Sequence, residues 1–120
     1  MPTIVYNPDS ILCSVKNYLG NYSMDDTIFD DQIIDCINSA ISELSILGVS
    51  SGETQFTVTS YEDEWADYLG STNTELIGHA RKYIECNVKL AFDPPASPTL
   101  VEILQSQMKK AGSYLKISCE

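Results

Sequence analysis

The residues best suited to chemistry in this chain are its single histidine and its four cysteines, which could in principle supply a thiolate nucleophile and its base. His79 and Cys86 are seven residues apart, which corresponds to about 10 Å along a helix. That separation is too long for the hydrogen bond that a nucleophile and its base must share. The other cysteines, at positions 13, 36 and 119, lie far from His79 in the sequence. We therefore predict no Cys–His catalytic pair.

Metal and cofactor sites have residue patterns of their own, and the chain lacks them. The cysteines form no CxxC pair and no histidine cluster accompanies them, which argues against zinc and favours reduced thiols. The acidic cluster Asp25–Asp35 has neither the central glycine nor the distal glutamate of a calcium loop. No glycine-rich phosphate loop is present. We predict no catalytic residue, no metal, no cofactor and no enzymatic activity.

The acidic residues are concentrated in one part of the chain. Residues 1–79 contain 13 acidic residues and one basic residue, Lys16, whereas residues 80–120 contain four acidic and six basic residues. The two parts carry formal charges of −12 and +2. Phosphate contacts require lysine and arginine, so this balance argues against general nucleic-acid binding. Three interpretations of the charge asymmetry remain. The acidic residues could form a solvated surface that aids solubility, the two oppositely charged parts could pack head to tail between copies, or the acidic part could form a wall that repels DNA.

Length and composition predict one folded domain over residues 1–120. A chain of this length with 43% hydrophobic residues can bury a core without disulfides or metals. No run of 18 apolar residues occurs, so we expect no membrane span. The N-terminus lacks the basic start and apolar segment of a signal peptide, so we expect no secretion signal.

Apolar residues recur with helical spacing along most of the chain, which predicts a mainly α fold. The pattern indicates a small bundle of about four helices, over about residues 10–20, 29–47, 74–92 and 98–111. A further short helix is expected within residues 60–70. Gly112 weakens the last helical pattern, so residues 112–120 are expected to form a flexible or partner-docking tail.

Residues 49–61 are expected to form a long, partly strand-like loop. Phe56 and Val58 alternate with polar neighbours, which is typical of a strand. A lone strand has no partner within this chain. It is therefore either a draped loop or an edge that pairs with another molecule.

The chain is predicted to break between the last two long helices, at Asp93, Pro94, Pro95, Ser97 and Pro98. The two adjacent prolines end the preceding helix, because proline lacks an N–H and clashes inside a helix. Asp93 precedes a proline and is pushed towards extended backbone. Ser97 is a good N-cap, and Pro98 suits the first helical position. These residues are predicted to form the turn of a helical hairpin.

Four stretches of the chain carry a family resemblance. They are SILCSVKNYLG (10–20), DTIFDDQIIDCINSAISELSIL (26–47), WADYLG (65–70) and YIECNVKLAFDPPASP (83–98). In this order they resemble the small head–tail connector (adaptor, or head-completion) proteins of long-tailed bacteriophages, and KLAFDPP is the most specific piece. The chain departs from the family after Ala111, where related chains often carry a segment with Trp and Arg.

The resemblance implies a structural virion protein of the neck that is made in the cytoplasm of the host bacterium. It implies a homo-oligomeric ring of about twelve copies, closed by rotation, beneath the portal protein. The ring would extend the DNA channel and offer a platform to the downstream stopper or tail protein. DNA would pass through without specific binding, and no membrane or cofactor would be involved.

Within that expectation, three groups of residues are assigned roles. Contacts between subunits are predicted for Phe56, Val58, Trp65 and Tyr68. An acidic channel lining is predicted for Asp25, Asp26, Asp30, Asp31, Glu62 and Asp63. Docking on the portal or a neighbouring ring is predicted for the tail residues Tyr114, Leu115 and Ile117.

Two other kinds of protein remain as alternatives. A stopper or tail-terminator protein would usually be rich in β structure, which this sequence does not predict. A small helical prophage-encoded interaction module would bind a host protein as a small dimer. Its assembly state would distinguish it from a connector.

Overall fold

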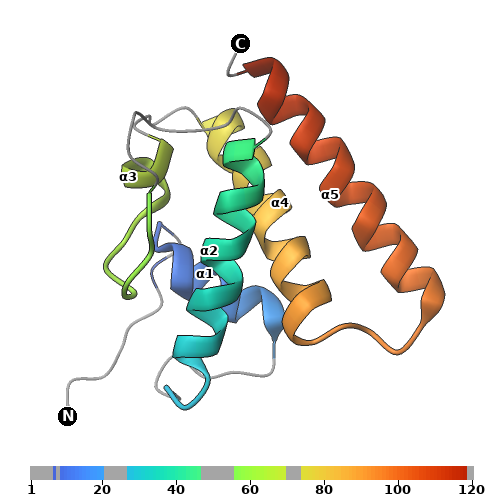
Figure 1. Cartoon of the computed structure of the whole chain (residues 1–120), viewed down its shortest axis with the longest axis horizontal. Helices are drawn as coiled ribbons and strands as arrows, with labels where there is room; N and C mark the ends of the chain where they lie inside the picture. Colours follow the sequence, from blue (N-terminus) through green and yellow to red (C-terminus); the bar gives the residue numbers. More distant parts are fainter. Residues whose placement is uncertain (1–6, 8, 21–26, 47–55, 70–73, 119–120) are drawn as a thin grey trace.

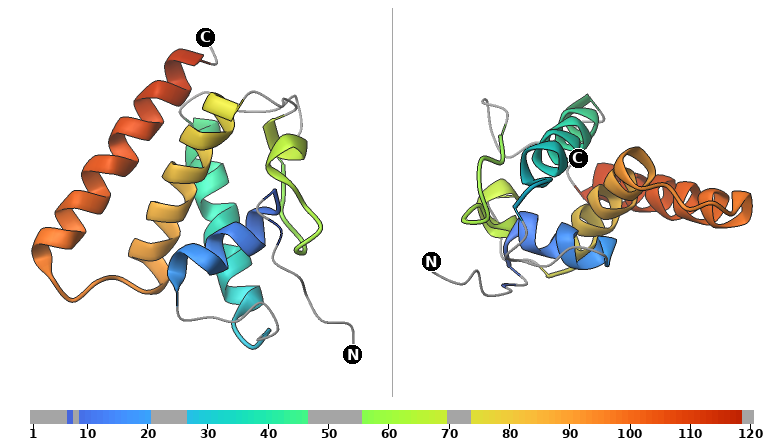
Figure 2. Two further views of the ribbon diagram at one scale, coloured as in Figure 1. Left: turned by 180° about the vertical axis from the view of Figure 1, so that it is seen from behind. Right: turned by 90° about the horizontal axis from the view of Figure 1, so that it is seen from below.

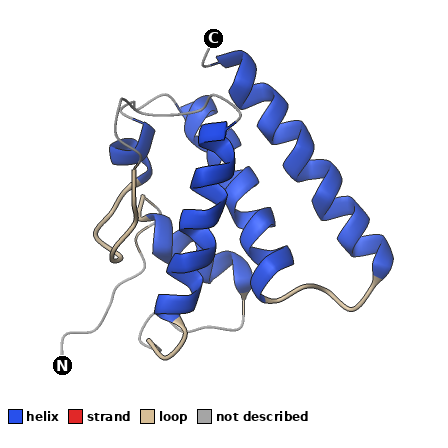
Figure 3. Cartoon of the chain, in the orientation of Figure 1, coloured by secondary structure: helices blue, strands red, loops and turns tan. Residues whose placement is uncertain are grey.

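The computed structural model describes residues 7, 9–20, 27–46, 56–69 and 74–118, and its described part is mainly helical. Five helices follow one another: α1 (Ile11–Leu19), α2 (Asp30–Ile46), α3 (Trp65–Leu69), α4 (Thr74–Phe92) and α5 (Pro98–Ser118). Helix α4 contacts each of the other four, as the ribbon in Figure 1 shows. The predicted small α-helical bundle with one short helix is confirmed (Figure 3).

The ends of the helices follow the capping residues of the sequence. Ser10 accepts a hydrogen bond from the Cys13 amide at 3.3 Å and so caps α1. Gly20 closes α1 with φ +84°, a backbone angle that glycine adopts without strain. Helix α4 ends at Phe92, before the two prolines, and the Ser97 hydroxyl accepts from the Leu100 amide at 3.4 Å. The predicted turn at residues 93–98 is confirmed.

The core lies between α1, α2 and α4. Helix α2 supplies Ile33, Ile37, Ile41 and Leu44, each 0% exposed, and α4 supplies Ile84 and Val88, also 0% exposed. β-branched isoleucines are weaker helix formers, so packing stabilises α2 more than intrinsic propensity does. Each fully buried aliphatic side chain contributes about 1.5–3 kcal/mol. This core holds the elements that position the protein's surfaces.

The strand-like segment around Val58 forms no strand in the described part of the chain. A side-chain amide takes the place of a strand partner: the Val58 N–H donates to Asn38 Oδ1 at 2.8 Å, and Asn38 Nδ2 donates to the Val58 carbonyl at 3.0 Å. These two bonds satisfy the backbone groups that an open edge would leave unpaired. Residues 56–61 are therefore a loop draped on α2, and the expectation that residues 49–61 are partly strand-like is wrong for this described part.

Helix α5 is longer than the sequence pattern indicates. It continues through Gly112 to Ser118, so the expected end at residue 111 is wrong, and residues 112–118 are helix. Leu115 is 0% exposed and Ala111 is 4% exposed. The burial of Leu115, worth about 2 kcal/mol, outweighs the cost of a glycine inside a helix, which is about 1 kcal/mol.

Helix α5 packs on α4 and leans away from the rest of the bundle. Val101, Leu104, Met108, Ala111 and Leu115 recur at spacings of three and four and form its inner stripe. Only the C-terminal members of that stripe, Ala111 and Leu115, are buried, and the first three are partly exposed. Figure 2 shows α5 extending away from the other helices. The N-terminal half of α5 is thus incompletely covered by its own chain.

Candidate interaction surfaces

The cysteines occupy packing positions. The Cys86 Sγ atom lies 3.8 Å from the Tyr18 hydroxyl and donates to Gln107 Oε1, also at 3.8 Å. Burial raises the pKa of Cys86, and it likewise raises the pKa of Cys36 with help from the nearby charge of Asp35. Both groups therefore remain protonated thiols at neutral pH, whereas a cysteine nucleophile needs a thiolate.

His79 has a ring contact of its own. It stacks on Tyr114 of α5, with ring centroids 4.8 Å apart and the planes tilted by 26°. In the described part of the chain, no three His, Cys, Asp or Glu side chains gather in a way that could hold a metal ion. The same part contains no helix that is both long and apolar enough to span a membrane.

The acids predicted to line a channel divide into engaged and exposed ones. Asp30 pairs with Lys16 at 2.9 Å, and the Lys16 side chain is only 3% exposed, so this ion pair joins α1 to α2. The Asp63 carboxylate accepts from the Thr59 amide at 2.8 Å and from the Ser60 amide at 3.2 Å, which shapes the turn before α3. The carboxylates of Asp30 and Asp63 thus make contacts within the fold.

Asp31 and Glu62 are exposed and remain candidates for a channel lining. Asp25 and Asp26 lie outside the described residues. A role for any of these acids in a channel stays a prediction, because a single copy of the chain does not show where a channel would run.

The residues predicted to contact a neighbouring subunit lie mainly in the core. Val58, Trp65 and Tyr68 are 1%, 2% and 1% exposed. Phe56 is half-buried, with its ring centroid 5.4 Å from that of Tyr68. These side chains join the loop and α3 to the bundle. In this conformation only Phe56 retains surface for another subunit, and the predicted interface role of all four remains a prediction.

The predicted docking tail is the last turns of α5. Leu115 is 0% exposed and packs in the core, so its side chain is not available to a partner in this conformation. Tyr114 is 44% exposed and Ile117 is 68% exposed. Docking by these two residues remains a prediction. Their positions show that one part of α5 serves the fold while another part stays on the surface.

Helix α5 carries large apolar residues that are exposed. Leu100 is 51% exposed and Ile103 is 45% exposed. They align with the exposed residues that follow at spacings of three and four: Gln107, Lys110, Tyr114 and Ile117. We call this set the α5 outer stripe. The signal was present in the sequence as a second heptad register, but periodicity did not show which register faces α4.

Helix α2 also carries large apolar residues on its outer surface. Ile28, just before the helix, is 79% exposed, and Ile46 at its end is 85% exposed. The exposed residues between them on the same face are Asp31, Asp35 and Ser39. We call the five residues the α2 outer stripe. Sequence reasoning missed it because its middle is polar and its apolar members stand at the ends.

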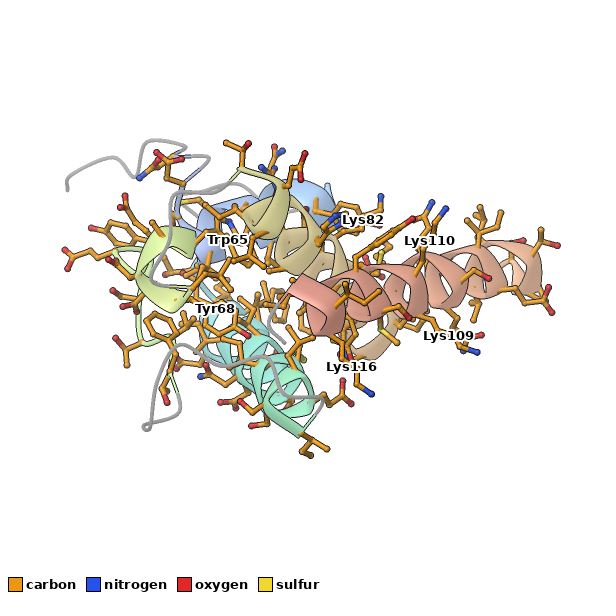
Figure 4. All side chains as sticks on the ribbon, turned by 90° about the horizontal axis from the view of Figure 1, so that it is seen from above. Trp65, Tyr68, Lys82, Lys109, Lys110 and Lys116 are labelled. Carbon is orange, nitrogen blue, oxygen red and sulfur yellow. The ribbon has the colours of Figure 1, made fainter. Side chains whose placement is uncertain are left out.

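The lysines of α4 and α5 lie on two flanks of α5. Figure 4 shows Lys82 and Lys110 on one flank, and Lys109 and Lys116 on the other. Among the described residues, none of these four lysines forms an ion pair. A hollow of about 510 Å³ lies beside Lys109 and Lys116. A smaller one of about 150 Å³ lies beside His79, Lys82, Lys110 and Tyr114.

The first 79 residues present the opposite charge. Their only basic residue besides His79 is Lys16, which is buried and paired. The exposed acids of α2 and of the segment before α3 therefore face solvent without a neighbouring base from the same part of the chain. The charge asymmetry of the sequence is thus an asymmetry of the molecular surface.

Comparison with known proteins identifies one family. A family model described as "Phage connector protein" matches residues 11–120, which include all five helices. No curated protein and no solved structure matches the chain.

Proposed function

The chain belongs to the phage connector family, which is structural, and from this premise we propose that it is a head–tail connector in the neck of the virion. In this role it forms a ring of about twelve copies beneath the portal protein. The ring extends the DNA channel and receives the downstream stopper or tail protein. The family match over residues 11–120 is the observation that carries the proposal.

The charge distribution supports passage of DNA without binding. DNA is retained by lysine and arginine contacts to phosphate, and each such contact adds to affinity. The described part of residues 9–69 has exposed acids, among them Asp31 and Glu62, while its lysine is buried. If that surface faces the channel, it repels phosphates and lets the genome slide.

The packing of α5 supports a role for its surface in joining proteins. The helix holds to the fold through Ala111 and Leu115, while Tyr114 and Ile117 stay exposed at its end. Contiguous exposed apolar residues mark interaction sites more often than chance placement does. We assign docking on the portal or on a neighbouring copy to Tyr114 and Ile117, and leave Leu115 in the core.

The proposal is tested by imaging the neck of the virion that carries this protein. A reconstruction of the portal vertex should show the five-helix chain as a ring directly below the portal. Particles made without the protein should contain filled heads that fail to join tails. A neck without this chain, or normal head–tail joining in its absence, contradicts the proposal.

A further inference from the structure

The α5 outer stripe is exposed at its two ends, whereas part of it contacts α4: Tyr114 stacks on His79, and Gln107 Oε1 accepts from Cys86. It runs from Leu100 to Ile117, with apolar residues at both ends and Gln107 and Lys110 in the middle. Leu100 and Ile117 are 51% and 68% exposed. At 1.5 Å per residue the stripe is about 26 Å long. Exposed apolar residues at both ends of such a stripe are typical of a surface that packs against a second helix.

We infer that the α5 outer stripe of one copy docks, antiparallel, on the α2 outer stripe of the next copy. The α2 outer stripe spans a similar number of residues, 18 from Ile28 to Ile46 against 17 from Leu100 to Ile117. It too has apolar ends, since Ile28 and Ile46 are 79% and 85% exposed. Its middle carries Asp31 and Asp35, the opposite charge to that of Lys110. The inference deepens the proposed ring by naming its contact, and rests on that proposed function.

The register follows from the positions of the residues. Lys110 stands seven residues before Ile117, and Asp35 stands seven residues after Ile28. When Ile117 lies on Ile28 in an antiparallel pair, Lys110 therefore lies opposite Asp35. In the same register Leu100 lies opposite Ser45, next to Ile46, and Gln107 lies opposite Asn38, next to Ser39. Apolar residues then meet at both ends of the pair, and Lys110 meets Asp35 between them.

Charge also decides between this contact and a two-fold contact of α5 with itself. A self-pairing of the α5 outer stripe would bring Lys110 of one copy close to Lys110 and Lys82 of the other. Lys82 and Lys110 share this flank, as Figure 4 shows. Glu85, one turn after Lys82 on α4, is already paired with Arg81 at 2.9 Å. It does not offset two lysines from each copy, whereas the two aspartates on α2 do.

The two stripes lie on different faces of the molecule, as a ring requires. In Figure 4, Lys82 and Lys110 are on the side of α5 that faces away from α2. A contact between two different faces is heterologous, so it can be repeated from copy to copy and closes if the rotation allows. A two-helix contact is small for a stable complex. We therefore expect weak self-association that strengthens when a ring closes.

The test uses charge reversal on the full chain, with self-association measured by sedimentation velocity up to about 1 mM, the range of weak complexes. Lys110→Asp and Asp35→Lys should each weaken association about tenfold or more, because each places like charges together. The double variant Lys110→Asp/Asp35→Lys should restore it. Mixing the two single variants should also restore association, with the two variants alternating, since the α5 outer stripe of each is complementary in charge to the α2 outer stripe of the other.

Lys109→Asp is the matched control, because it makes the same charge change on the opposite flank of α5. It should associate as the unchanged chain does. Loss with Lys109→Asp equal to that with Lys110→Asp, no rescue in the double variant, or an unchanged chain that is monomeric at every concentration overturns the inference. A normal neck ring built from Lys110→Asp protein would also overturn it, while leaving the connector function intact.

Discussion

Helices α2 and α5 are both long and amphipathic, yet the chain covers them very differently. Ile33, Ile37 and Ile41 of α2 are 0% exposed, because α1 and α4 pack against them. Along α5 the buried residues are Ala111, Gly112 and Leu115, and all three lie in its C-terminal half. Helix α2 therefore belongs to the core, whereas α5 is buried mainly in its C-terminal half and leaves the N-terminal half partly exposed.

The difference also appears on the outer faces of the two helices. Each carries apolar residues at the ends and polar residues between them, but the polar residues are acidic on α2 and include a lysine on α5. A chain that carries two complementary stripes on separate faces can associate head to tail with further copies of itself. Mutations that separate core from surface on each helix test this comparison.

The largest effect is expected inside α2. Ile37→Ala removes a side chain that is 0% exposed, and such core truncations cost about 2–5 kcal/mol because a cavity remains. Ile46→Ala, at a position 85% exposed, should change stability by less than about 0.5 kcal/mol. Urea unfolding followed by circular dichroism measures both. Equal losses in the two variants would contradict the assignment of the inner and outer faces of α2.

The next effect concerns the two halves of α5. Leu115→Ala should cost about 2–3 kcal/mol because Leu115 is 0% exposed. Leu104→Ala, on the same inner stripe but partly exposed, should cost clearly less. The same unfolding measurement compares them. A larger loss at Leu104 would mean that α5 is covered along its whole length and would remove the contrast with α2.

A smaller effect is expected where the loop meets α2. Asn38→Ala leaves the Val58 N–H and carbonyl without their partners, which costs about 1–3 kcal/mol for buried groups. Ser39→Ala, the exposed neighbouring position, is the control. Amide hydrogen exchange should accelerate at Val58 in Asn38→Ala protein alone. Unchanged protection of Val58 would show that the loop is held by other contacts.

The smallest effect is a pH dependence from Glu85. Burial raises the pKa of Glu85, and Arg81, 2.9 Å away, only partly offsets this. A carboxyl group whose pKa is higher in the folded state binds protons more readily when folded. Its contribution to stability therefore grows as pH falls from neutral towards that raised pKa, and is lost as pH rises.

Glu85→Gln tests this by removing the titrating group. The unfolding free energy of the unchanged chain should rise more steeply between pH 7 and pH 5 than that of Glu85→Gln protein. A difference of the opposite sign would show that the Arg81 charge dominates over burial. Glu102→Gln, on the exposed face of α5, should leave the slope as it is in the unchanged chain.

Much of the fold was readable from the order of residues. Ser10 and Gly20 bound α1, and the two prolines with Ser97 and Pro98 bound the hairpin of α4 and α5, because caps and breakers act within a few residues of themselves. The isoleucine spacing on α2 identified its buried face. Family membership was also predicted from four local stretches of the sequence, and the family model matches residues 11–120.

The roles assigned to single residues were less readable. Asp30 and Asp63 looked like free acids, yet one pairs with Lys16 and the other accepts backbone amides. Val58 looked like part of an open edge until Asn38, twenty residues earlier, proved to bond with it. These partners are distant in sequence, and periodicity contains no information about them.

The sequence by itself determined the helices, their boundaries at caps and prolines, and the separation of charge between the two parts of the chain, since all three depend on local residues. The tertiary structure decided which stripe of α5 is covered and how far that helix runs. Packing of Leu115 against the bundle outweighs the glycine at 112, and Leu100 and Ile103 stay exposed because they lie off the stripe of α5 that faces α4. Both outcomes depend on where α4 lies, which no local pattern specifies.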